Sequence, residues 1–248
     1  MGLILQAGFT ALWLRALRGD VSFKPFAVGE CWDSERTIAD CIDEANAWSD
    51  NPVGAFDFPL RWRLRDLCDS YGFSLRTLTE RGVLVWARPE QAVTFVENHD
   101  VARDTPIIND KLLAYAFILT HEGYPCVFWQ DYFNWNLAQP DNQSGIEALV
   151  KVHEQNAAGA TQILLINDDL YIMQRSGTGD HNGLVFVLNN RGTWNGTWVQ
   201  TRWNNKRLVP AAWHGRDDVG APQEKWTNES GWVDLWAAPR GYAVYVPE

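Results

Sequence analysis

The chain has 248 residues, 46% hydrophobic and 21% charged, which is typical of a soluble globular protein with one large and one small domain. Its formal net charge is -10 and it has no basic run or stripe of Lys and Arg, so nucleic acid is not an expected partner. The 14 Trp, 11 Phe and 7 Tyr supply rings that fill cores and, when exposed, stack on flat ligands such as sugars.

The N-terminal segment and the cysteines exclude several other classes. Residues 1–20 are apolar, but their arginines follow the apolar part, so we expect a core-facing helix and not a signal peptide. No stretch reaches the roughly 18 uninterrupted apolar residues of a membrane span. The cysteines lack a CxxC pair and any metal-ligand spacing with the histidines, so we expect buried free thiols at Cys31, Cys41, Cys68 and Cys126.

From residue 1 to about 157 the sequence alternates between short apolar runs and longer helical segments. The runs are apolar on both faces, which is typical of parallel strands covered by helices. We expect strands at 26–30, 54–58, 92–97 and 125–129, and helices near 3–18, 34–48, 59–71, 109–121 and 144–157. This succession predicts an α/β domain built from βα units.

After residue 160 the sequence changes to short alternating runs separated by Gly, Asn and Asp turns, such as "GLVFVLNN" and "GYAVYVP". Period-two alternation with turns at this spacing predicts an antiparallel β domain. The boundary therefore falls near Gly159, with domains at 1–159 and 160–248. Seven Trp lie between Trp194 and Trp236, where they form either the core of this domain or a carbohydrate platform.

Acidic residues end three of the predicted strands: Glu30, Asp57 and the cluster Glu97–Asp100. Parallel strands place their carboxyl ends on one face of a sheet or barrel, so these groups should converge on a pocket. Two facing carboxyl groups are the minimum needed to split a glycosidic bond, because one protonates the leaving oxygen while the other attacks or stabilises the transition state. A nearby His can orient a sugar hydroxyl.

At these residues the chain resembles the α-amylase family of glycoside hydrolases. "FAVGECW" at 26–32 is similar to the fifth-strand motif of the family, "GAFDFPL" at 54–60 to the segment around strand six, and "VTFVENHD" at 93–100 to the seventh-strand motif. "YAFILTHEGYPCVFW" at 115–129 resembles the eighth-strand region, and the β domain resembles the C-terminal sandwich of the family.

The resemblance implies roles for individual residues. Glu30 would be the general acid/base and Asp100 the transition-state stabiliser, with His99 and Asn98 beside it at the subsite where the bond is cut. Trp32 would be a stacking wall for a glucose ring, with core packing as an equal alternative. Two further residues, His121 and Trp129, are expected in the core.

Two motifs of the family do not occur in this sequence: Gly-x-Arg-x-Asp, with the nucleophile of strand four, and Asp-x-x-x-x-Asn-His of strand three. Residues 1–20 resemble the helix after strand four, which implies a truncated (β/α) barrel of about the last four βα units, followed by the antiparallel β-sandwich. Asp20 is poorly placed for a nucleophile, so residual hydrolysis would need Glu97, Asp33 or Asp57 to activate a water, with inversion. The calcium ligands of the family come largely from the missing regions, so we expect no metal or other cofactor.

Three functions remain open. The first is an α-amylase-like hydrolase of the α-1,4 bonds in starch and maltooligosaccharides; the second is a glucan-binding protein without activity; the third is a fragment active only with a complementing chain. Four strands without partners leave open edges, so we also expect self-association or another cover. No G-x-S-x-G elbow supports a Ser/His/Asp hydrolase.

Overall fold

The computed structural model describes residues 26–48, 53–217 and 219–248, and the predicted helix at 3–18 and Asp20 lie outside these ranges. Contacts divide the chain into two compact units. The first unit holds the described residues up to Arg63 together with Glu80–Phe95 and Gly123–Cys126, and the second holds Leu64–Thr79, Val96–Glu122 and Val127–Glu248.

The first unit contains the parallel sheet that the sequence predicts. Its strands are β1 (Ala27–Gly29), β2 (Val53–Phe56), β3 (Ala92–Phe95) and β4 (Tyr124–Cys126), hydrogen-bonded in that order and all parallel. Helix α2 (Glu35–Trp48) follows β1, α3 (Phe58–Asp69) follows β2, and the short helices α4 (Leu84–Ala87) and η2 (Pro89–Gln91) precede β3. The α/β prediction for this part of the chain is therefore confirmed.

Aromatic rings and a close backbone approach hold this sheet together. The rings of Phe56 and Phe58 each meet the ring of Phe95 edge-on, with centroids 5.1 Å apart. A side chain at Gly54 would place its Cβ 2.8 Å from the carbonyl oxygen of Gln91, so only glycine lets η2 approach β2 this closely. The carboxyl ends of β1 and β2, where Glu30 and Asp57 follow, consequently lie along one edge of the sheet.

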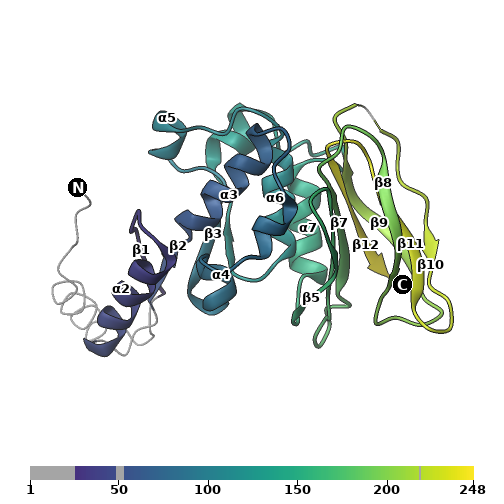
Figure 1. Cartoon of the computed structure of the whole chain (residues 1–248), viewed down its shortest axis with the longest axis horizontal. Helices are drawn as coiled ribbons and strands as arrows, with labels where there is room; N and C mark the ends of the chain where they lie inside the picture. Colours follow the sequence, from purple (N-terminus) through teal and green to yellow (C-terminus); the bar gives the residue numbers. More distant parts are fainter. Residues whose placement is uncertain (1–25, 49–52, 218) are drawn as a thin grey trace. The chain divides into compact units, whose positions relative to one another are not determined.

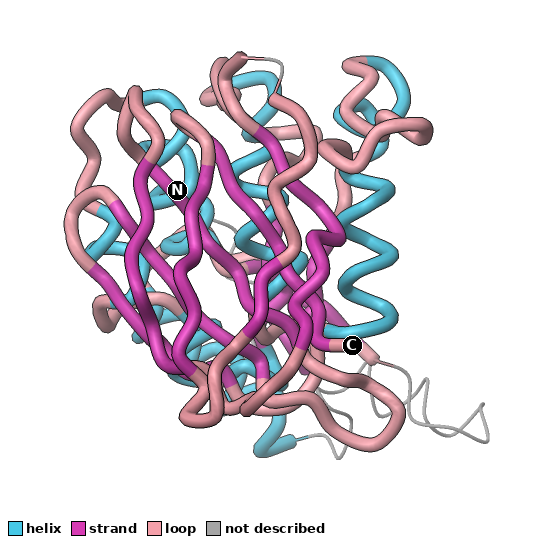
Figure 2. Tube along the Cα trace, turned by 90° about the vertical axis from the view of Figure 1, so that its right-hand side faces the viewer, coloured by secondary structure: helices cyan, strands magenta, loops and turns pink. Residues whose placement is uncertain are grey.

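The second unit contains the predicted antiparallel strands and several helices. Its helices are α5 (Val101–Asp104), α6 (Lys111–Thr120), α7 (Ile146–Asn156), the 3-10 turn η1 (Leu75–Thr79) and the π-helical turn η3 (Gln130–Asn134). Six strands form one sheet in the order β10 (Lys225–Trp226), β9 (Arg207–His214), β12 (Gly241–Pro247), β7 (Leu184–Asn189), β6 (Leu170–Arg175) and β5 (Thr161–Ile166). Strands β8 (Asn195–Gln200) and β11 (Trp232–Ala237) pair as a second sheet. Figure 2 shows the strands of this part of the chain in magenta.

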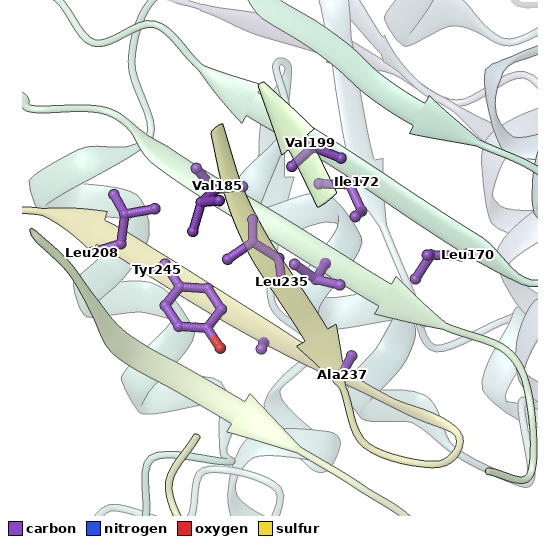
Figure 3. Close-up of a cluster of buried hydrophobic side chains, with 11 residues drawn as sticks. Leu170, Ile172, Val185, Val199, Leu208, Leu235, Ala237 and Tyr245 are labelled. Carbon is purple, nitrogen blue, oxygen red and sulfur yellow. The ribbon is translucent and has the colours of Figure 1, made fainter. Parts of the chain in front are cut away.

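The six-stranded sheet is covered on both faces. Toward β8 and β11 it buries a cluster of apolar side chains, of which Val185, Leu208, Val199 and Leu235 are drawn in Figure 3. The opposite face packs against α6 and α7, which lie beside β7 and β12 in Figure 1. Strands β6 and β7 are therefore buried at every position.

Helices α6 and α7 therefore group with the C-terminal sheets, so the compact units do not divide at Gly159, where the sequence places its boundary. The domains 1–159 and 160–248 stay a prediction. No helix in the described ranges combines the length and hydrophobicity needed to cross a bilayer.

A buried histidine joins α6 to the sheet. The His121 ring stacks on Phe117 at 3.8 Å between centroids, Nδ1 lies 2.7 Å from the Phe117 carbonyl oxygen, and Nε2 lies 2.9 Å from the Tyr171 hydroxyl. Burial is the main cause that lowers the pKa of His121 to about 3, and the nearby Arg175 acts in the same direction. The expected core position of His121 is confirmed.

His121 should make the stability of the protein depend on pH. Because its folded-state pKa lies below its ordinary value of 6.5, its contribution is present above pH 6.5 and is lost as the pH falls toward about 3. The free energy of unfolding should fall by about 1.4 kcal/mol per pH unit from this group in that window. A His121→Gln variant, which keeps one donor and one acceptor, should show a flatter pH dependence in denaturant titrations, and an unchanged slope would contradict this assignment.

Candidate functional site

Glu30 and Trp32 lie together in the loop that follows β1. The Trp32 indole Nε1 donates a hydrogen bond of 3.0 Å to Glu30 Oε1, and the Glu30 side chain is exposed. The Trp32 ring packs against the Phe58 ring at a centroid distance of 4.7 Å while 42% of the residue stays exposed. The loop therefore presents a carboxylate whose position is fixed by a half-exposed aromatic ring.

The neighbouring Asp33 has a structural role at the start of α2. Its Oδ1 accepts hydrogen bonds from the Ser34 N–H at 2.6 Å and from the Thr37 hydroxyl at 3.0 Å. These two bonds, the Ser34 one first, lower the pKa of Asp33 below its usual range. The Ser34 Oγ in turn accepts from the Thr37 N–H at 3.3 Å, as an N-cap residue does, so Asp33 positions the capping residue at the start of α2.

Asp57 joins the starts of two helices in the first unit. The residue is fully buried. Its Oδ1 accepts a hydrogen bond from the Leu60 N–H at 3.1 Å, and its Oδ2 accepts one from the Val85 N–H at 2.8 Å. Burial raises the pKa of this carboxyl although its hydrogen bonds act in the opposite direction. The hypothesis that Asp57 activates a catalytic water is wrong, because solvent does not reach the group.

In the second unit, Asn98 shapes the segment that follows β3. Its Oδ1 accepts hydrogen bonds from the Asp100 N–H at 3.1 Å and the Val101 N–H at 2.8 Å, at the start of α5. Asp100 is held by Arg103 at 3.0 Å and lies 3.5 Å from His99 Nε2, while 29% of the Asp100 side chain stays exposed. The structure thus brings three of the predicted residues, Asn98, His99 and Asp100, into one turn with His99 exposed.

Glu97 belongs to a buried ion-pair network instead. Its Oε1 accepts from the Ile107 N–H at 2.6 Å and lies 3.4 Å from the Lys111 ammonium. Lys111 also pairs with Asp131 at 2.6 Å, and Tyr115 donates a hydrogen bond of 2.6 Å to the other Asp131 oxygen. Burial raises the pKa of Tyr115, so the phenol stays protonated. The hypothesis that Glu97 activates a water is therefore also wrong, because its side chain is buried and paired.

The segment after β4 exposes aromatic rings that the sequence interpretation did not assign to a site. Trp129 was expected in the core at the end of a strand, yet β4 ends at Cys126 and Trp129 is 67% exposed ahead of the π-helical turn η3. Its ring lies 4.1 Å from that of Phe133, and the Lys111 ammonium lies 5.7 Å from the Trp135 ring. Five aromatic residues interleaved with polar ones in "FWQDYFNW" were the available signal.

Glu30 and Trp32 belong to the first unit and Asp100 to the second, so the meeting of Glu30 with Asp100 stays a prediction. Strands β1 and β3 are separated only by β2. At the usual spacing of about 4.8 Å per strand, their carboxyl ends are about 10 Å apart along the edge of the sheet.

Comparisons with known proteins show that the chain is similar to α-amylases. A family model described as "Alpha-amylase C-terminal" matches residues 184–246. An α-amylase of Geobacillus stearothermophilus is 33% identical over 190 residues, which cover 72% of this chain and 33% of that protein. The α-amylase of Bacillus licheniformis is 26% identical over 260 residues, which cover 98% of this chain and 48% of that protein.

Solved structures show the same relationship at the level of the fold. The crystal structure of an α-amylase from Geobacillus thermoleovorans in complex with acarbose matches with a TM-score of 0.67 and 18% identity, covering 98% of this chain and 57% of that chain. An Anoxybacillus α-amylase matches with a TM-score of 0.69 and 17% identity. The chain spans about a third to a half of the length of the two curated relatives above.

Removing the Lys111 ammonium should destabilise the second unit. Lys111→Met leaves the Glu97 and Asp131 carboxylates close together, buried and without their cation, so we expect a loss of about 3–5 kcal/mol in the free energy of unfolding. The matched control is Lys151→Met, which breaks an exposed ion pair with Glu147 and should change stability little. Equal stabilities of the two variants in urea titrations would show that the network does not hold the segment.

Proposed function

Because this chain is a relative of the α-amylase family of glycoside hydrolases, we propose that it acts on the α-1,4 bonds of starch and maltooligosaccharides. The observation that carries the proposal is the placement of acids after two parallel strands. Glu30 follows β1, and the segment with Asp100 follows β3. The named activity of the curated relatives agrees with this chemistry.

The environments of the two carboxylates suit different roles. Glu30 is the proposed general acid/base: it is exposed, and the Trp32 N–H fixes one of its oxygens while the exposed part of the Trp32 ring can stack on a sugar. Asp100 is the proposed transition-state stabiliser, because its partly exposed carboxylate, held by Arg103 at 3.0 Å, can face an oxocarbenium-like charge. His99, exposed beside Asp100, is placed to bond a sugar hydroxyl, and Asn98 orients both by fixing the turn.

The motif that carries the family's nucleophile does not occur in this sequence, so no residue of the chain is assigned that role. Asp57 and Glu97 are buried, and Asp33 is engaged at the start of α2. We therefore propose that the four parallel strands correspond to part of a (β/α) barrel, and that full activity depends on a carboxylate from a complementing chain.

The outer strands of the parallel sheet also favour an additional partner. Within the described residues, β1 and β4 each pair with only one strand, and Phe26, Val28 and Tyr124 on or beside these strands are 43–48% exposed. Unpaired edges with apolar side chains promote association. We propose that self-association or a complementing chain covers them.

Charge at the β1 edge should weaken that association. Val28→Lys places an ammonium group on the exposed edge, so we expect the native mass to shift toward the single chain over a dilution series. Val246→Lys provides a control on β12, which is paired on both sides within the six-stranded sheet. A single-chain mass for the wild-type protein at every concentration would contradict self-association.

Release of reducing sugar from soluble starch tests the catalytic proposal. Glu30→Gln and Asp100→Asn keep the shape of each side chain and remove its charge, so each should lower the rate by about 10²–10⁴-fold. Asp33→Asn is the matched control, because the Asn Oδ1 can still accept from the Ser34 N–H and the Thr37 hydroxyl, so the rate should stay within about twofold.

The outcomes separate the candidate functions. Equal traces from the wild-type protein and both carboxylate variants would contradict catalysis by this chain and leave glucan binding as the alternative. Activity that appears only when the barrel half of an α-amylase is added, and that disappears with Glu30→Gln, would support the complementing fragment. Activity of the wild-type chain alone, lost in both variants, would support an independent hydrolase.

A further inference from the structure

Two of the four cysteines belong to a single βα unit. Cys31 lies in the loop after β1, between Glu30 and Trp32, and Cys41 lies in α2, which runs back along the parallel sheet (Figure 1). Both carry free thiols, and both are partly exposed, although the sequence predicted buried cysteines. A small reagent in solution can therefore reach them.

Contacts at either end hold the segment that contains Cys31 against α2. At one end, the Thr37 hydroxyl of α2 donates a hydrogen bond of 3.0 Å to Asp33 Oδ1. At the other end, Ala27 of β1 packs against a buried cluster that includes Ala45 of α2. The segment from Ala27 to Asp33 thus follows the helix from Ala45 back toward Thr37.

The spacing along α2 brings Cys41 opposite this segment. Thr37, Cys41 and Ala45 are four residues apart, so they share one face of the helix and follow each other at about 6 Å along its axis. A segment that contacts α2 at Thr37 and at Ala45 must pass Cys41 between these points. Cys31 lies in that middle part of the segment.

The side chain of Cys31 also has the orientation that a meeting requires. The hydrogen bond from Trp32 to Glu30 places these two side chains on the same side of the loop. Side chains alternate along extended backbone, so Cys31 between them points to the opposite side. The loop therefore presents the carboxylate and the indole on one side and the thiol on the other.

The electrostatics of Cys31 agree with this placement. Burial acts first, and the Cys41 thiol and the Asp33 carboxylate act in the same direction, so that the pKa of Cys31 is raised to about 11. One thiol can influence the pKa of another only when the two sulfurs are close together. The geometry of α2 and the titration of Cys31 thus indicate the same pair.

The other two cysteines are less suited to pair with Cys31. Cys126 lies in β4, three strands from β1, which corresponds to about 14 Å at about 4.8 Å per strand and exceeds the span of a disulfide. Cys68 is buried, and its Sγ donates a hydrogen bond of 3.4 Å to the Asp110 carbonyl oxygen. Cys41 is therefore the partner that the fold offers to Cys31.

We propose that Cys31 and Cys41 form a reversible disulfide by exchange with a low-molecular-weight disulfide, and that this bond fixes the loop with Glu30 against α2. One cysteine thiolate attacks the reagent RSSR, and a mixed disulfide forms while RS⁻ leaves. The second cysteine thiolate attacks the protein sulfur of the mixed disulfide, and the second RS⁻ leaves. Two electrons pass from the cysteine pair to the reagent, and the two thiol protons end on two molecules of RSH.

The raised pKa of Cys31 sets the conditions for this exchange. Because the thiolate is the reacting form, formation of the disulfide should be slow at neutral pH and faster in mild alkali. A sulfur whose thiol has a high pKa is also a poor leaving group, so the completed bond should be reduced slowly. The inference does not depend on the proposed hydrolysis of glucans, because its readout is a covalent bond.

Peptide mapping of the full chain after incubation with oxidised glutathione at about pH 8.5 tests the proposal. Arg36 lies between the two cysteines, so trypsin followed by mass spectrometry should find the peptide that ends at Arg36 linked to peptide 37–61. Cys31→Ser and Cys41→Ser should each abolish the linked peptides. The matched control, Cys126→Ser, should retain them, and alkylation before digestion prevents exchange during the analysis.

The intact mass distinguishes the expected bond from other products. The single chain should lose about 2 Da, which corresponds to the two hydrogen atoms removed, and dithiothreitol should restore the original mass. Glutathione that stays on either cysteine without linked peptides would overturn the proposal. Linked peptides found only in a disulfide-bonded dimer would overturn it too, as would two thiols that stay unmodified.

The stability of the oxidised chain shows whether the bond fits the native fold. A disulfide from Cys31 to Cys41 closes a loop of about 11 residues and should lower the unfolding equilibrium constant about a hundredfold in urea titrations. This comparison of oxidised with reduced wild-type protein needs no variant. Equal urea midpoints for the two forms would contradict a disulfide that fixes the loop in its native position.

Discussion

The parallel hydrogen-bond register of β1, β2, β3 and β4 is the constraint on which the candidate site depends. Parallel pairing brings the carboxyl ends of the strands to one edge, so loops far apart in the sequence leave the sheet from neighbouring positions. Glu30 follows the first strand directly, and the turn with Asp100 follows the third. Local contacts orient each side chain within its own unit, Trp32 for Glu30 and Arg103 for Asp100.

The acids near the strand ends divide according to their surroundings. Asp57 is buried against backbone N–H groups at two helix starts, and Glu97 is buried beside Lys111, so their charges are used to hold the chain together. Glu30 is exposed and Asp100 is partly exposed, and only such groups can meet a substrate. A similar sequence position therefore supports two different uses, and burial decides between them.

In the second unit, the same division applies to aromatic residues. The six-stranded sheet uses one face for α6 and α7 and the other for β8 and β11, so Tyr171 and Phe186 are buried. The β8–β11 pair has only its inner face covered by the larger sheet, and its outer face carries Trp198, Trp232 and Trp236. The sequence left open whether these tryptophans form the core of the β domain or a platform on its surface. The strand register places Trp198, Trp232 and Trp236 on the outer face of the β8–β11 pair.

The sequence by itself determined the order of the parallel strands and helices, the antiparallel strands after residue 160, and the resemblance to the α-amylase family, because hydrophobic periodicity and strand-end motifs are local. It also predicted the buried position of His121. Only the tertiary structure decided that Trp129 is exposed, that strands β6 and β7 are covered on both faces, and that Asp57 and Glu97 are structural. Those outcomes depend on contacts with residues distant in the chain, such as Val85 for Asp57 and the helices for the sheet, and local spacing carries no information about them.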